Sequence, residues 1–224
     1  MFQDKIVVIT GGVQGIGKCI ADEFLKEGAM VCVIDKQPGG YFTGDLADER
    51  TLSAFADKVI SEYGHVDYLI NNALPLMKGI DTCSYDEFNY ALRVGVTAPF
   101  YLAKLFAPYF SQGAAIINIS STRDRMSQPQ TESYAAAKGG ISALTHALAV
   151  SFSGKVRVNS IIILYFLMVD ITFSFLWTSW ACQLSGSCPA LSPASLSAWG
   201  WACPDPVSTA LCPAWWLRWS CPPN

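Results

Sequence analysis

Residues 10–17 read Thr-Gly-Gly-Val-Gln-Gly-Ile-Gly, a glycine-rich stretch that predicts the class of fold. An apolar run at 5–10 precedes it, and apolar residues with helical spacing follow it, so it is predicted to be a tight strand-to-helix turn. We expect Gly11 to permit the turn, Gly15 to let the backbone approach a pyrophosphate, and Gly17 to let the helix pack closely on the strand. The stretch therefore predicts a dinucleotide-binding loop, with the helix N-terminus facing the phosphates.

An acidic residue stands where such a loop needs one. Asp35 ends the second predicted strand, 30–35, and follows Gly17 by 18 residues. A carboxylate there accepts both hydroxyls of an adenosine ribose and repels a 2′-phosphate, so it favours NAD over NADP. Gln14 adds no positive charge to the loop, although Lys36 follows the carboxylate directly.

The rest of the first 160 residues alternates between strands and helices. Strands are predicted at 5–10, 30–35, from about 41, 66–70, 114–121 and 156–161, and helices at 15–28, 49–63, 85–110 and 133–151. Only 36–40 connect the second and third strands, too few residues for a crossover helix. Asp48 is predicted to cap one helix, and Ser84 with Glu87 to form a capping box on the next. The pattern predicts an α/β, Rossmann-like doubly wound parallel sheet in one domain, 1–160.

A tyrosine and a lysine share one face of the last predicted helix. Tyr134 and Lys138 are four residues apart, and Ser121 ends the strand before them. Side chains at positions i and i+4 are neighbours on a helix, so the ammonium can stabilise the phenolate and lower the phenol pKa from about 10. The pair, with a strand-end serine and a glycine loop upstream, predicts a site for proton transfer.

These motifs closely resemble the short-chain dehydrogenase/reductase superfamily in its classical, single-domain form over residues 1–161. The resemblance rests on the 10–17 loop, Asp35, Asp45-Leu46, Asn71-Asn72-Ala73, Ser121, Tyr134 and Lys138. It implies an NAD-dependent oxidoreductase acting on a secondary alcohol or ketone, with Tyr134 as general acid/base and Ser121 on the substrate oxygen. The cofactor residues that it implies are Gly11, Gln14, Gly15, Ile16, Gly17, Asp35, Asp45, Leu46, Asn72, Ala73, Tyr134 and Lys138. It also implies a homodimer through helices 85–110 and 133–151.

The sequence departs from the family pattern at three places. Gly95 stands where many members carry an asparagine that supports a proton path to the lysine, and Leu74 stands where a glycine usually follows Asn-Asn-Ala. After Ile161 the family normally reaches a Pro-Gly that opens the substrate loop, whereas this chain continues Ile162-Ile163-Leu164. We therefore expect weakened proton relay and weak or absent turnover.

The tail, 161–224, differs from the rest of the chain in composition. It holds all seven tryptophans, five of the eight cysteines and only three of the 33 charged residues. One interpretation is a membrane span at 161–177, which would anchor a non-enzymatic nucleotide-binding protein. Asp170 interrupts this apolar run, and inserting its charged side chain at the centre of the bilayer would cost about 2.5–3.5 kcal/mol. Another interpretation is a native substrate-side segment. We favour a third, loss of the coding frame near codon 161, in which case the product could be non-functional.

Charge and cysteine content limit the partners. A net charge of -3 gives no reason to expect a nucleic-acid partner. His65 and His146 lack metal-ligand spacing and the tail cysteines form no CxxC pair, so no metal is predicted. No signal peptide precedes Cys19, Cys32 and Cys83, which are therefore expected to be free thiols of a cytoplasmic protein.

Overall fold

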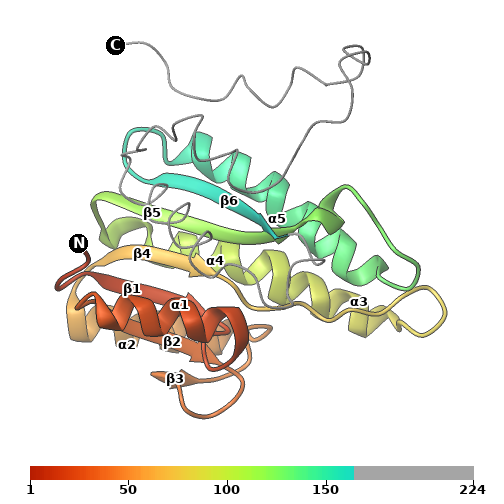
Figure 1. Ribbon diagram of the computed structural model, residues 1–224, viewed down its shortest axis with the longest axis horizontal. Coiled ribbons are helices and arrows are strands. Elements are labelled where there is room, and N and C mark those ends of the chain that lie inside the picture. Colours follow the sequence, from red (N-terminus) through yellow and green to blue (C-terminus); the bar gives the residue numbers. More distant parts are fainter. Residues whose placement is uncertain (164–224) are drawn as a thin grey trace, which may run out of the picture. The chain divides into compact units, whose positions relative to one another are not determined.

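The computed structural model describes residues 1–163, which form a six-stranded parallel sheet flanked by helices (Figure 1). In chain order the elements are β1 (Ile6–Thr10), α1 (Gly15–Lys26), β2 (Met30–Asp35), β3 (Phe42–Thr43), α2 (Glu49–Tyr63), β4 (Val66–Asn71), α3 (Tyr85–Leu92), η1 (Arg93–Thr97), α4 (Ala98–Phe106), η2 (Ala107–Tyr109), β5 (Phe110–Ser121), η3 (Thr122–Asp124), α5 (Glu132–Ser151) and β6 (Arg157–Ile163). The strand order is β3-β2-β1-β4-β5-β6. Because the order reverses between β1 and β4, the carboxyl ends of these two strands border a crevice, which confirms the Rossmann-like doubly wound sheet.

The connections agree with the local sequence signals. No helix separates β2 from β3, as the short spacing predicted. The Asp48 carboxylate accepts the N–H of Arg50 at the start of α2. The Ser84 hydroxyl accepts the N–H of Glu87, whose carboxylate accepts the N–H of Ser84, so the predicted capping box is present at α3.

The helical stretch predicted at 85–110 is present over 85–109, but a π-helical turn interrupts its α-helical hydrogen bonding. The chain forms α3, a π-helical turn at η1, then α4 and the short η2, and β5 already begins at Phe110. Gly95 in η1 lies so close to α5 that a Cβ atom there would be 2.8 Å from the Cβ of Ala137. Pro108 in η2 has no N–H to continue the hydrogen bonding of α4. The π-helical turn therefore lies where the helical stretch packs closely against α5, and the stretch ends in the short η2 turn that contains the proline.

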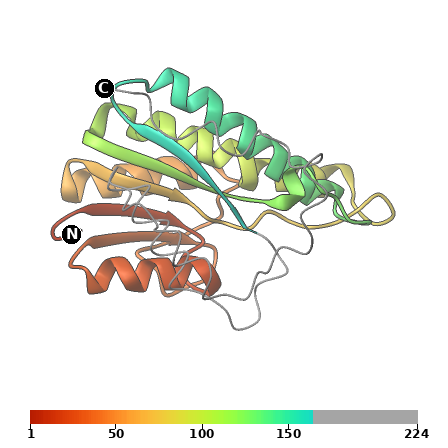
Figure 2. The same cartoon turned by 45° about the horizontal axis from the view of Figure 1, so that its top comes forward.

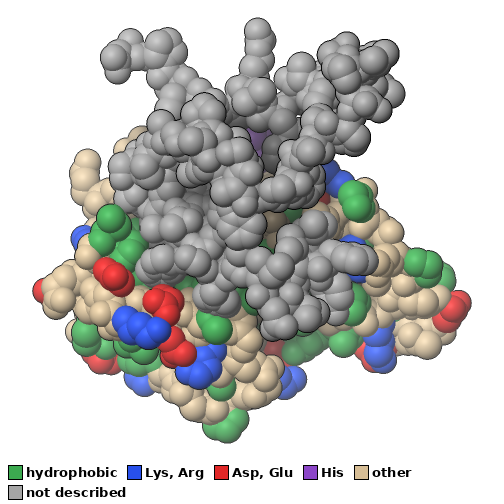
Figure 3. Space-filling model, in the orientation of Figure 1, with side chains coloured by type: hydrophobic (Ala, Val, Ile, Leu, Met, Phe, Trp, Pro, Cys, Tyr) green, Lys and Arg blue, Asp and Glu red, His purple; other side chains and the backbone are tan. Residues whose placement is uncertain are grey.

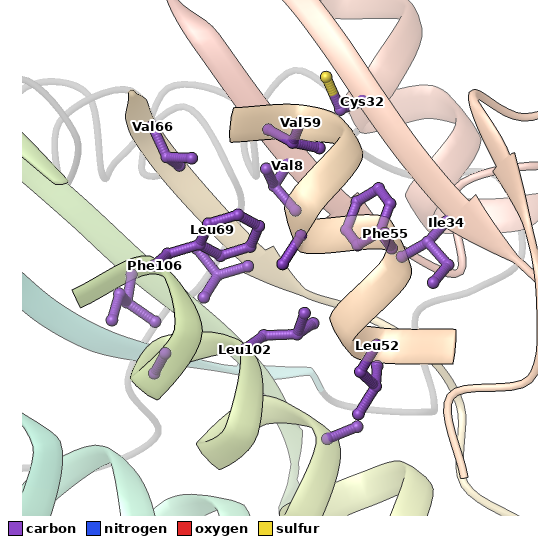
Figure 4. Close-up of a cluster of buried hydrophobic side chains, with 14 of the residues drawn as sticks. Val8, Cys32, Ile34, Leu52, Phe55, Val59, Val66, Leu69, Leu102 and Phe106 are labelled. Carbon is purple, nitrogen blue, oxygen red and sulfur yellow. The ribbon is translucent and has the colours of Figure 1, made fainter. Parts of the chain in front are cut away.

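Helices cover the two faces of the sheet with separate apolar clusters. On one face, α2 and α4 pack on the strands through the side chains labelled in Figure 4, among them the fully buried Phe55 and Phe106, whose ring centroids lie 6.4 Å apart. On the other face of the sheet lies α1 (Figure 2). Its Phe24 ring stacks on Tyr68 of β4, with ring centroids 6.0 Å apart. Helices therefore pack on both faces of the sheet around β1 and β4, the strands that border the crevice.

The last described strand, β6, pairs with β5 and extends to Ile163, two residues beyond its predicted end. The predictions for the tail, including most of the 161–177 span and five cysteines, lie outside the described residues. Within residues 1–163, no helix is long and apolar enough to cross a membrane. Among the described residues, Cys19, Cys32 and Cys83 form no disulfide with one another. On the described surface visible in Figure 3, charges of both signs are interspersed.

Candidate active site

The glycine-rich loop follows β1 and is held open by backbone geometry. Gly11 and Gly15 have φ values of +68° and +59°, in the left-handed region that glycine tolerates. A Cβ atom at Gly17 would collide with the carbonyl oxygen of Gly11, so only glycine permits this approach of α1 to the loop. Nothing lies within 4 Å of a Cβ built at Gly15, which leaves the backbone there accessible. The loop thus has the shape that a pyrophosphate requires.

Asn72 ties this loop to the end of β4. Its side-chain amide donates to the carbonyl oxygens of Thr10 at 3.1 Å and Gly11 at 2.8 Å. The Thr10 hydroxyl in turn accepts the N–H groups of Asn72 and Ala73, at 3.0 and 3.1 Å. The two sides of the crevice are therefore joined by four hydrogen bonds. Asn72 and Ala73, both predicted to lie in the cofactor cleft, thereby fix the width of the crevice.

Asp35 lies at the end of β2 with its carboxylate already oriented. One oxygen accepts the N–H of Val13 from the glycine loop at 3.1 Å, and the other accepts the N–H of Gln37 at 3.0 Å. Each carboxylate oxygen keeps acceptor capacity for a further donor. The side chain is therefore positioned beside the loop before any ligand binds.

Ser121, Tyr134 and Lys138 meet at the end of β5. The Ser121 hydroxyl oxygen accepts the N–H of Arg123 at 3.3 Å, which leaves its O–H to be donated. Lys138 is buried, its ammonium donates to the carbonyl of Ile119 at 2.7 Å, and it lies 5.5 Å from the ring centroid of Tyr134. Burial lowers the pKa of Lys138 to about 8. Tyr134 and Lys138 are thus neighbours on the first turns of α5, and Ser121 at the end of β5 lines the same pocket.

All residues predicted to bind cofactor or to react line a single pocket of about 550 Å³. The volume lies in the range of small-molecule and cofactor sites. Leu74 also lines it and is 73% exposed. Sequence reasoning missed five further lining residues, Tyr90, Val94, Ile119, Ser120 and Ile163. Ile119 and Ser120 adjoin Ser121 on β5 and could have been inferred, whereas Tyr90 reaches the pocket from α3 and no sequence signal identifies it.

Comparison with known proteins extends the match beyond the motifs. A model of the short chain dehydrogenase family matches residues 5–172, past the last of these motifs. An uncharacterized oxidoreductase of Thermotoga maritima is 38% identical over 181 residues, which span 72% of this chain and 71% of that protein. The L-fucose dehydrogenase of Mus musculus is 35% identical over 176 residues, 71% of this chain and 64% of that protein.

A solved structure agrees in fold as well as sequence. The apo SCOR enzyme from Clostridium thermocellum superposes with a TM-score of 0.68 at 39% identity, covering 78% of this chain and 77% of that one. The family match spans the glycine loop, both sides of the crevice and the Ser-Tyr-Lys cluster. This chain therefore belongs to the short chain dehydrogenase family, whose members bind nicotinamide cofactors.

Proposed function

We propose that this chain is an oxidoreductase that uses NAD(H) and acts on a secondary alcohol or the corresponding ketone. The observation that carries the proposal is the shared pocket: the glycine loop and Asp35 line one part, and Ser121, Tyr134 and Lys138 line another. A nucleotide-binding loop alone would fit many functions, but a buried lysine four residues after a tyrosine adds acid–base chemistry.

The residues present fit a nicotinamide dinucleotide. The open backbone at Gly15 and the close approach at Gly17 form a cradle that a Cβ atom would obstruct or distort. Asp35 is held where it would accept the adenosine ribose hydroxyls, which supports NAD over NADP. When bound, the nicotinamide supplies or accepts the hydride.

The protein side chains would bind the substrate oxygen and transfer its proton. Ser121 donates its hydroxyl to the substrate oxygen and so fixes its distance from Tyr134. During ketone reduction the Tyr134 phenol gives its proton to that oxygen, and during alcohol oxidation the phenolate takes it back. Lys138, held by the Ile119 carbonyl, stabilises the phenolate by its positive charge.

The substrate class is a compound with a carbinol carbon, and sugars belong in any screen because the mouse relative is an L-fucose dehydrogenase. The full chain should be assayed with NAD and a panel of aldoses and secondary alcohols, with nicotinamide absorbance as the readout. Tyr134→Phe should abolish turnover and retain saturable NADH binding. Tyr109→Phe, in η2 directly before the start of β5, is the matched control and should retain turnover. If the unsubstituted chain turns over above background, an equal rate for Tyr134→Phe would refute the assigned proton donor.

A further inference from the structure

Three side chains from separate segments meet at the rim of the pocket. Lys36 follows β2, Asp45 follows β3, and Tyr90 lies on α3. The Lys36 ammonium lies 3.0 Å from the Asp45 carboxylate and 3.4 Å from the Tyr90 hydroxyl. Tyr90 donates to the same carboxylate, with distances of 3.1 and 3.2 Å to its two oxygens. We call Lys36, Asp45 and Tyr90 the Lys36 clasp.

The Lys36 clasp lies next to the residue that selects the ribose. Lys36 is the immediate neighbour of Asp35, and both line the same pocket. Among the described lining residues the cations are Lys36 and Lys138. The Lys138 ammonium already donates to the Ile119 carbonyl and lies over the Tyr134 ring. A cation beside this carboxylate is what a 2′-phosphate on the ribose would require. Lys36 is therefore the side chain whose availability decides whether a phosphorylated ribose is tolerated.

The electrostatics keep both members of the ion pair charged. The hydrogen bonds that the Lys36 ammonium donates to Asp45 and Tyr90 raise the pKa of Lys36. Desolvation acts to raise the pKa of Asp45, but hydrogen bonds from Ala47, Lys36 and Tyr90 outweigh it, so the net shift is downward. The Lys36 side chain is 69% exposed, so the pair alone is weak and screened by salt. The phenol of Tyr90 adds a second contact to each partner and thereby favours the paired arrangement.

We propose that the Lys36 clasp is a specificity device in which Asp45 and Tyr90 neutralise and hold the Lys36 ammonium, so that the site discriminates against NADP(H) more strongly than Asp35 alone would. The inference rests on the proposed function and adds two specificity residues, Asp45 and Tyr90, to it. Asp45 would thus act through Lys36 as a positioning residue, in addition to any contact of its own with the nucleotide.

The test compares the affinities of the full chain for NADH and NADPH by nicotinamide fluorescence. Asp45→Asn keeps the side-chain shape and removes the charge, so the ratio of the NADPH to the NADH association constant should rise about fivefold, the size of one partly exposed ion pair. Lys36→Met in the unsubstituted chain should change the ratio less than about twofold, because the ammonium is already held. Lys36→Met added to Asp45→Asn should abolish the gain.

Tyr90→Phe provides a second variant that leaves the ion pair in place. It removes the phenol contacts and should raise the ratio by about twofold, the smaller share expected of one neutral hydrogen-bonding group. The far-ultraviolet circular dichroism of each variant should match that of the unsubstituted chain.

Two results would overturn the Lys36 clasp. An unchanged ratio in both Asp45→Asn and Tyr90→Phe would show that Lys36 is not restrained. A gain that persists in the Asp45→Asn, Lys36→Met double variant would show that the charge at position 45 acts without Lys36. Binding of neither nucleotide to the unsubstituted chain would instead contradict the proposed function, so the two failures are distinguishable.

Discussion

The ammonium nitrogen of Lys138 lies 2.7 Å from the carbonyl oxygen of Ile119, and this hydrogen bond joins α5 to β5 at the wall of the pocket. Lys138 is only 4% exposed, and burial lowers its pKa to about 8. The carbonyl stabilises the charged form in a site that otherwise disfavours it. The Lys138 ammonium is thus positioned by the strand that ends in Ser121. Its distance from the Tyr134 ring therefore depends on the packing of α5 against β5, although both residues lie on α5.

The first prediction concerns stability and pH. Because the pKa of Lys138 is about 8 in the folded chain and 10.5 in a free lysine, the unfolded chain binds more protons between these values. The free energy of unfolding of the unsubstituted chain, minus that of Lys138→Met, should therefore rise by up to about 3 kcal/mol from pH 8 to 10.5. Denaturant titrations at several pH values measure it.

Lys26→Met is the control for this prediction. Lys26 pairs with Glu23 on α1, which raises its pKa, so its contribution should stay constant up to pH 10.5 and decrease only above that value. A pH-independent difference for Lys138→Met would mean that the Lys138 ammonium is not desolvated in the fold.

The second prediction concerns the π-helical turn. Gly95→Ala places a methyl group 2.8 Å from the Cβ of Ala137, so η1 or α5 must shift. The change should lower the free energy of unfolding by about 1–3 kcal/mol and reduce kcat, because Ala137 lies between Tyr134 and Lys138. Gly139→Ala on α5, where the nearest atom is 4.0 Å away, should stabilise the chain by about 0.5–1 kcal/mol. If the two substitutions changed the free energy of unfolding equally, close packing against Ala137 would not explain why a glycine is needed at position 95.

The third prediction concerns the crevice. Asn72→Ala removes the two side-chain hydrogen bonds to the glycine loop and should weaken NADH binding about tenfold, or about 1.4 kcal/mol. Asn89→Ala on α3, where the amide donates to Tyr85 at an exposed position, should leave the affinity within about twofold. Titration with NADH measures both. If Asn72→Ala left the affinity for NADH unchanged, the hydrogen bonds from Asn72 to the glycine loop would not contribute to nucleotide binding.

The sequence could predict the residues that lie at strand ends, and could not predict contacts between segments. Asp35 and Ser121 were identified because parallel strands bring their carboxyl ends to one edge, and a glycine loop marks which edge. Tyr90 was missed because its contact with Asp45 depends on the orientation of α3, which periodicity does not encode. The π-helical turn around Gly95 cannot be predicted for the same reason, because an apolar stripe continues through such a turn.

Fluorescence titration of the full chain with NADH measures whether the pocket at the crevice binds a nicotinamide dinucleotide. We expect saturable binding that NAD displaces. We also expect loss of binding in Gly17→Ala, where the methyl group would collide with the Gly11 carbonyl and displace Asn72. No saturable binding at high micromolar NADH, or equal binding by Gly17→Ala, would contradict nucleotide binding at this pocket.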